Sequence, residues 1–149
     1  MQVSSQGRPG RVFVLRLEDG DRLPDALEAF ARDNDVSCAF CAMLGGAGGG
    51  KLVCGPKDRD SLPPDPILMP VEDAREVAAV GTIFPDAEGN PVLHMHAATG
   101  RGQSTLTGCV RPGVDVWLVG EVVVLELLDV DMARLPDAAS GMALLAKRG

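Results

Sequence analysis

The chain has 149 residues, 46% of them hydrophobic, and a formal net charge of −7. This length suits one domain with its own core. The acidic balance disfavours a surface devoted to nucleic acid, because binding the phosphate backbone requires clustered Lys and Arg. No apolar run reaches the roughly 20 residues that span a bilayer, and the first residues, MQVSSQGRPGR, lack the apolar centre of a signal peptide. We therefore expect a soluble cytoplasmic protein.

The first third of the chain predicts a strand followed by a helix. Residues 1–10 are polar and predict a flexible tail, with residues 11–149 forming a single domain. The alternation in RVFVLRL predicts a strand that ends at a turn near Asp19. In RLPDALEAFARDND, apolar residues recur at helical spacing and Asn34 suits a stop, so we expect a helix there.

The remaining segments predict mostly strands. The stretches VSCAFCAML, KLVCG, AREVAAVGTIF and SGMALLAK each predict a strand, with a glycine-rich loop after the first and a proline-rich loop after the second. PVLHMHAATGRGQSTLTGCV predicts a hairpin, and VDVWLVGEVVVLELLDV predicts two strands or one long bent strand in mid-sheet. The expected fold class is α+β, with a largely antiparallel mixed sheet of about seven strands and one or two helices packed on it.

The glycine-rich stretch MLGGAGGGKLVC resembles a phosphate-binding loop only in part. Gly45, Gly50 and Lys51 match most of G-x-x-x-x-G-K-[ST], but Leu52 replaces the Ser or Thr that holds magnesium. No helix pattern follows whose N-terminus could face a phosphate. The pattern therefore favours glycines that serve the backbone, and nucleotide binding is the weaker interpretation.

Cys38 and Cys41 form a C-x-x-C pair, which elsewhere marks zinc or redox sites. In a strand, residues three apart point to opposite faces and cannot share one ion. A redox pair would precede a helix, and no helix pattern follows. We expect both cysteines to be buried in the core.

The two histidines of the chain, His94 and His96, are two residues apart in the predicted hairpin. In a strand they share one face. A hairpin tip at Arg101-Gly102 places His94 opposite Cys109, with Cβ atoms roughly 5 Å apart. Two imidazoles and a thiolate suit Zn²⁺, with water, a substrate group or a carboxylate such as Glu121 as the fourth ligand. The alternative is two solvated histidines with Cys109 buried behind them.

At this hairpin the sequence resembles the plants-and-prokaryotes-conserved (PPC) domain over nearly the whole chain. The resemblance lies in GRVFVLRLEDGDRLPDALEAFARDNDV, GGAGGGKL, GTIFPDAEGNPVLHMHAATGRGQSTLTGCV, GEVVVLEL and SGMALLAK. It implies an α+β fold, a homotrimer and a metal, usually zinc, on three histidines. The first two match His94 and His96, whereas the third position holds Cys109, which changes the donor type.

The sequence is compatible with two functions. Members of the family are often labelled DNA-binding, and the chain would then be a regulatory scaffold; GRPGR, residues 7–11, lacks the R-G-R-P core of an AT-hook. Alternatively, the chain is a metal-dependent small-molecule protein or an enzyme of unknown reaction, with Glu121 or Glu126 as a general base. The scattered positive residues disfavour DNA binding.

Overall fold

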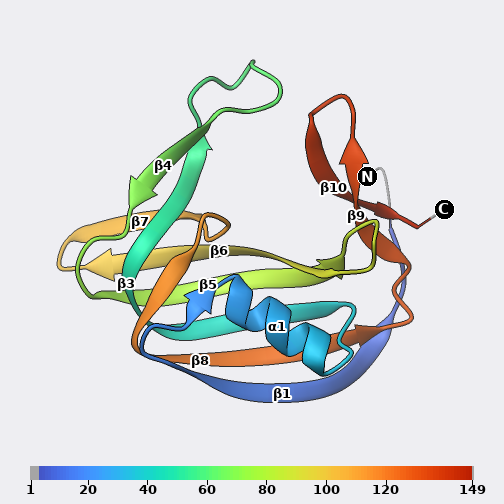
Figure 1. The fold of residues 1–149 in the computed structure, drawn as a ribbon, viewed down its shortest axis with the longest axis horizontal. Helices are drawn as coiled ribbons and strands as arrows, with labels where there is room; N and C mark the ends of the chain where they lie inside the picture. The colour runs from blue at the N-terminus through green and yellow to red at the C-terminus, as the bar shows by residue number, and fades with distance from the viewer. Residues whose placement is uncertain (1–3, 149) are drawn as a thin grey trace.

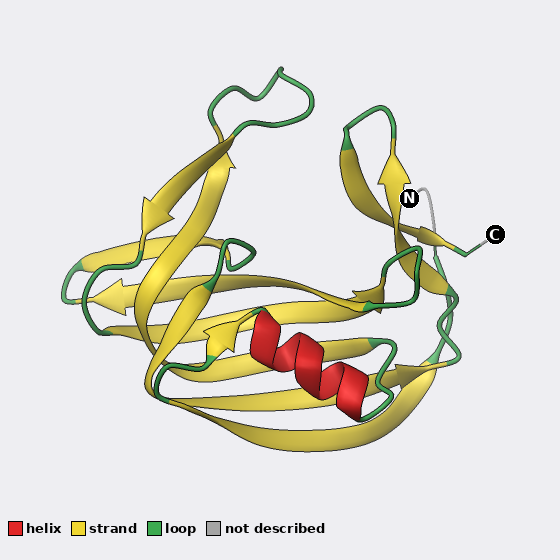
Figure 2. Cartoon of the chain, viewed as in Figure 1, coloured by secondary structure: helices red, strands yellow, loops and turns green. Residues whose placement is uncertain are grey.

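A large antiparallel sheet with one helix packed on it makes up most of the computed structural model, which describes residues 4–148 (Figure 1; Figure 2). The main sheet runs in the order β1-β8-β3-β5-β6-β7, with β2 beside β8 and β4 beside β3, while β9 and β10 form a separate hairpin. This confirms the predicted α+β class. The elements are β1 (Arg8–Glu18), β2 (Arg22–Leu23), α1 (Asp25–Asp33), β3 (Ala39–Pro56), β4 (Pro66–Pro70), β5 (Arg75–Pro85), β6 (Pro91–Arg101), β7 (Ser104–Cys109), β8 (Val114–Leu128), β9 (Met132–Asp137) and β10 (Met142–Lys147).

Helix α1 covers one face of the sheet, which is the core face. Acidic residues occupy its first turn and Arg32 its last, as the helix dipole favours. Leu27 and Ala31 are fully buried against the sheet. The Glu28 carboxylate accepts a hydrogen bond of 2.9 Å from the backbone N–H of Leu93 in β6. The helix is thereby fixed over the strand that carries both histidines.

The opposite face of the sheet is apolar but exposed. Strand pairing aligns Val14 with Val123, then Ala42 and Val80 on the next strands, and finally His96 on β6. Val80 is 58% exposed although it lies in the middle of a sheet. We call this surface the apolar sheet face; its large exposed members are Val12, Val14, Phe40, Leu44, Val80 and Val123.

The glycine-rich segment is not a loop, so that prediction was wrong. It lies inside β3, an 18-residue strand that pairs with β8, β5, β4 and β7. Gly45 has φ +146°, and a Cβ there would collide with the carbonyl oxygen of Val119. Lys51 pairs with Pro70 and starts no helix, so the features of a phosphate-binding loop are missing. The glycines let β3 bend and approach β8 closely.

Several element boundaries differ from expectation. β1 begins at Arg8, within the predicted tail, whose residues 1–3 lie outside the described part of the chain. β4 lies within the predicted proline-rich loop, and β9 was not predicted. The segment from Val114 is one long bent strand, with a positive φ of 65° at Leu118 next to a register shift. Across residues 4–148, no helix has the length and apolar character needed to cross a membrane.

Candidate metal centre

The β6–β7 hairpin brings His94, His96 and Cys109 together on one side of the sheet. The predicted pairing of His94 with Cys109 was wrong, because His96 is the residue opposite Cys109. The two central residues of the turn are Gly102 and Gln103 rather than Arg101 and Gly102, which moves the register by two residues. A shift of two keeps every side chain on its face, whereas a shift of one would have separated the three.

The distances within the cluster fit a single small cation. One ligand atom from each of the three residues lies within 4.8 Å of the other two, and the two Nε2 atoms are 3.2 Å apart. Two nitrogens bound tetrahedrally to zinc at about 2.05 Å would lie about 3.3 Å apart. A hydrogen bond between the two imidazoles gives a similar separation. The donor set of two nitrogens and one sulfur suits zinc.

The surroundings favour the neutral form of the histidine ring. Partial burial of the His94 ring, followed by the charges of Arg134, His96 and Arg111, lowers the pKa of His94. A neutral imidazole is the form that binds a metal. Cys109 is only 6% exposed, whereas both histidines are exposed. The cluster is thus open on the histidine side and closed behind the thiol.

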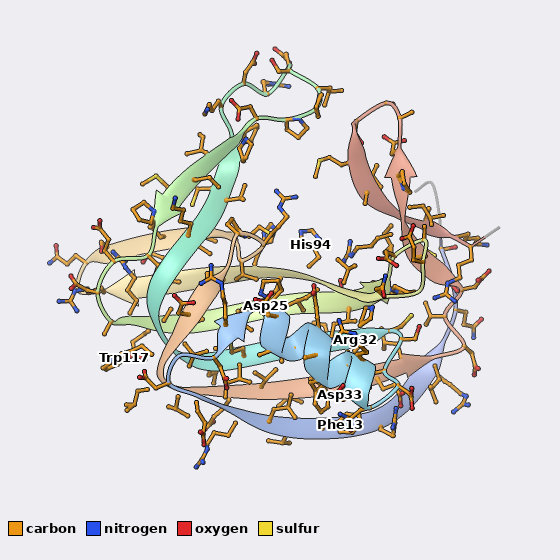
Figure 3. All side chains as sticks on the ribbon, viewed as in Figure 1. Phe13, Asp25, Arg32, Asp33, His94 and Trp117 are labelled. Atoms are coloured by element: carbon orange, nitrogen blue, oxygen red, sulfur yellow. The ribbon has the colours of Figure 1, made fainter. Side chains whose placement is uncertain are left out.

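The β9–β10 hairpin lies next to the cluster and contributes an arginine. In Figure 1 this hairpin and the β3–β4 hairpin both project from the same edge of the fold, and His94 lies towards them in Figure 3, away from the helix residue Asp25. Arg134 of β9 donates a 3.0 Å hydrogen bond from Nη2 to Thr82 Oγ1. Thr82 is paired with His94 across β5 and β6, so Arg134 of the β9–β10 sheet reaches the cluster of His94, His96 and Cys109.

The two carboxylates considered from sequence lie elsewhere. Glu121 faces the same way as His96 but lies three strands away and two residues further along, about 16 Å on a flat sheet with 4.8 Å per strand and 3.4 Å per residue. It does not belong to the ligand cluster found among residues 4–148. Glu126 is buried on the core face and ion-paired with Arg11, which lowers its pKa to about 2. A carboxylate with so low a pKa is a poor general base.

The cysteine pair is buried, as predicted. Cys41 has no exposed surface and belongs to the main core, while Cys38 packs with Phe84 and Met132 in a smaller one. The positions of Arg134 and Arg111 beside the cluster were not predicted from the sequence. Arg111 is two residues after Cys109, a spacing that could have been noticed, but Arg134 reaches the site only through the unpredicted strand β9.

Comparison with known proteins identifies the family. Residues 4–128 match the Plants and Prokaryotes Conserved (PCC) domain, and the chain belongs to this family. Its fold is shared by a metal-containing protein from Archaeoglobus fulgidus (22% identity, TM-score 0.85, 99% of this chain and 100% of that one). It is also shared by a plant- and prokaryote-conserved protein from Pyrococcus horikoshii (20%, TM-score 0.84, 99% of each chain). At these identities the similarity establishes the fold alone.

Two further comparisons concern proteins with other assigned roles. A protein from Ralstonia eutropha JMP134, proposed to bind DNA, has the same fold (18% identity, TM-score 0.74, 99% of this chain and 95% of that one). The bifunctional protein GlmU of Synechococcus sp. (strain JA-3-3Ab) is 29% identical over 134 residues, or 88% of this chain. The present chain spans about a fifth of the length of that relative (20%).

Proposed function

We propose that this chain is a zinc-binding protein whose functional site is formed by His94, His96 and Cys109. The observation that carries the proposal is the approach of their ligand atoms to within 4.8 Å of one another. Cys109, which stands where the resemblance to the family implies a third histidine, supplies a thiolate, and thiolates are common zinc ligands. A zinc ion with one position free of protein ligands supplies a Lewis acid that polarises a bound carbonyl or activates water.

The zinc proposal is tested by the metal content of the purified protein. We expect about one zinc per chain in the wild type, and far less in His96→Ala and Cys109→Ala. Cys54→Ala is the matched control, because Cys54 is a half-buried free thiol outside the cluster. Replacing zinc by cobalt should give a sulfur-to-metal absorption band that Cys109→Ala abolishes. A wild type without metal after exposure to zinc would refute the proposal and leave the two imidazoles hydrogen-bonded.

We further propose that the subunits associate as a homotrimer through the apolar sheet face. Its exposed members form a continuous surface across four strands, β1, β8, β3 and β5, and contiguous apolar surfaces of this kind mark interfaces. His96 lies at the margin of this surface and lines a cavity of about 600 Å³ there with Leu44, Val80 and Glu121. Assembly would therefore place the metal centre near a subunit boundary.

The homotrimer is tested by the molar mass in solution. Light scattering should give three times the 15.6 kDa of the chain, and Val80→Glu should shift the mass towards one chain, because a charge would be buried without a partner. Leu62→Glu is the control: Leu62 is 63% exposed in a loop away from this face. A wild type that remains monomeric at high concentration would overturn the assembly.

A second candidate function is a DNA-associated regulatory scaffold. It is supported by the fold shared with proteins proposed to bind DNA. The net charge of −7 opposes it, because phosphate contacts require a concentrated positive surface. Measuring the affinity for duplex DNA at two salt concentrations tests this role. Affinity that falls steeply with salt would favour the scaffold, and undetectable binding at low salt would exclude it.

A further inference from the structure

A second feature adjoins the proposed metal centre, a cavity of about 360 Å³ between the β6–β7 hairpin and the β9–β10 hairpin. His94 and Cys109 form one side of it, and Arg111 and Arg134 also line it. None of its lining residues is acidic, although the chain as a whole carries a charge of −7. The cavity is therefore a local concentration of positive charge, the kind of site that attracts an anion.

Arg134 carries the buried polar atom of this cavity that has no hydrogen-bond partner within the described part of the chain. It is half-buried, its Nη2 donates to the neutral hydroxyl of Thr82, and its Nε is buried with no acceptor among residues 4–148. Within the same residues, neither Arg134 nor Arg111 forms an ion pair with a carboxylate. A partly desolvated guanidinium without an anionic partner is costly, and a planar carboxylate from outside would match its donor geometry.

The remaining walls of the cavity are apolar, which restricts the ligand further. Val92 of β6 lies on the same face as His94, and Met142 and Ala143 come from β10. The volume is at the lower end of the range of about 300–1,000 Å³ for small-molecule sites. An inorganic anion would leave these apolar walls without a partner. A ligand with a carboxylate at one end and an apolar body at the other would contact both kinds of wall.

We propose that this cavity binds a small organic carboxylate, with Arg134 and Arg111 holding the carboxylate and the β6 and β10 side chains enclosing the apolar body. This proposal rests on the zinc site proposed above, because zinc would act on the reactive end of the ligand. It adds the class of molecule that the cavity would present to the zinc. The arginines act by charge and hydrogen bonding, and the metal cluster adjoins the same cavity through His94 and Cys109.

The test uses the full chain, in zinc-loaded and zinc-free forms, and benzoate as the probe. Calorimetry should show benzoate binding, with the neutral benzamide and inorganic phosphate at least tenfold weaker. Arg134→Met should weaken benzoate binding roughly 10- to 100-fold, the effect expected for lost hydrogen bonds between charged groups. Arg134→Lys should recover only part of this, because lysine keeps the charge without the planar fork.

Arg59→Met is the matched control, because Arg59 is 91% exposed in a loop and lies outside the cavity. It should leave benzoate affinity unchanged. Circular dichroism and zinc content establish that Arg134→Met is folded. If it is not, Arg111→Met replaces an exposed side chain and should weaken benzoate binding in the same direction.

The outcomes separate this inference from the zinc proposal. Zinc at full occupancy with benzoate bound no better than benzamide would overturn the carboxylate site alone. So would benzoate binding that His96→Ala abolishes and Arg134→Met leaves intact, since the carboxylate would then lie on the metal. Phosphate bound as tightly as benzoate would also overturn it. Arginine-dependent benzoate binding by a chain that never takes up zinc would support the carboxylate site and refute the metal.

Discussion

The ion pair between Glu126 and Arg11 should contribute more to folding than any exposed pair of this protein. The Glu126 side chain is 7% exposed and accepts hydrogen bonds from the backbone N–H of Arg11 (3.0 Å), its Nε (2.8 Å) and its Nη2 (2.7 Å). The guanidinium in turn lies 5.1 Å from the ring centroid of Phe13, which packs edge-on against Phe30 of α1. The pair therefore closes one end of the core beneath the helix.

The size of this contribution follows from the acidity of Glu126. Hydrogen bonds from the Arg11 side chain and backbone lower its pKa from 4.5 to about 2. At about 1.4 kcal/mol for each tenfold change in acidity, the ionised form stabilises the fold by about 3 kcal/mol. Because the folded pKa is the lower one, this stabilisation is complete above pH 4.5 and is lost as the pH falls towards 2. For a domain of this size, Glu126→Gln should lower the melting temperature by about 6–12 °C at neutral pH.

Thermal unfolding followed by circular dichroism, at one protein concentration and several pH values, measures this effect. The control is Glu18→Gln, because the Arg16–Glu18 pair has side chains 73% and 76% exposed and should contribute at most about 1 kcal/mol. The difference between wild type and Glu126→Gln should shrink as the pH falls below 4.5. A melting temperature within 2 °C of the wild type at pH 7, or a difference that does not vary with pH, would refute the reasoning.

Two other predictions concern backbone packing and thiol reactivity. Gly45→Ala should destabilise the fold by more than about 2 kcal/mol, because the added Cβ would meet the carbonyl of Val119. Gly89→Ala is the control: Gly89 also has a positive φ but nothing within 4 Å, so the substitution should destabilise the fold by only about 1–2 kcal/mol. Equal losses of stability for the two variants in urea unfolding would contradict the steric argument. Burial raises the pKa of Cys41 to about 12, so iodoacetamide at pH 8 should label the half-buried Cys54 long before Cys41, as read by mass spectrometry. Comparable labelling rates in the native protein would show that β3 opens readily.

The proximity of His94, His96 and Cys109 could be predicted from the sequence because it depends on strand parity more than on register. His94 and His96 share a face wherever the strand pairs, and Cys109 joins them for any even shift of the hairpin. The turn position was off by one residue at each end, since nothing local distinguishes Arg101-Gly102 from Gly102-Gln103. The predicted partner of Cys109 was wrong, but the three side chains lie close together in the structure.

Other parts of the fold could not be predicted because they depend on contacts distant in sequence. The segment Gly45–Gly50 has a composition typical of a loop, yet it lies entirely within strand β3, where it pairs with β8 on one side and, as far as Ala47, with β5 on the other. Strand propensity is overridden where a neighbour requires a close backbone approach. The apolar pattern of β9 is too short to indicate a strand by itself. The position of Arg134 beside the cluster therefore could not be predicted from the sequence.

The pairing of β1 with β8 has a consequence for how the chain can fold during its synthesis. Within the described residues 4–148, β8 (residues 114–128) is the only strand that pairs with β1 (residues 8–18). β3 takes one of its two long neighbours from the same late segment. A nascent chain that ends before β8 would therefore leave β1 without a hydrogen-bonded partner strand, and Leu17 would lack part of the core that buries it. Completion of the sheet must wait for most of the polypeptide, and sheets dominated by such distant pairings form slowly.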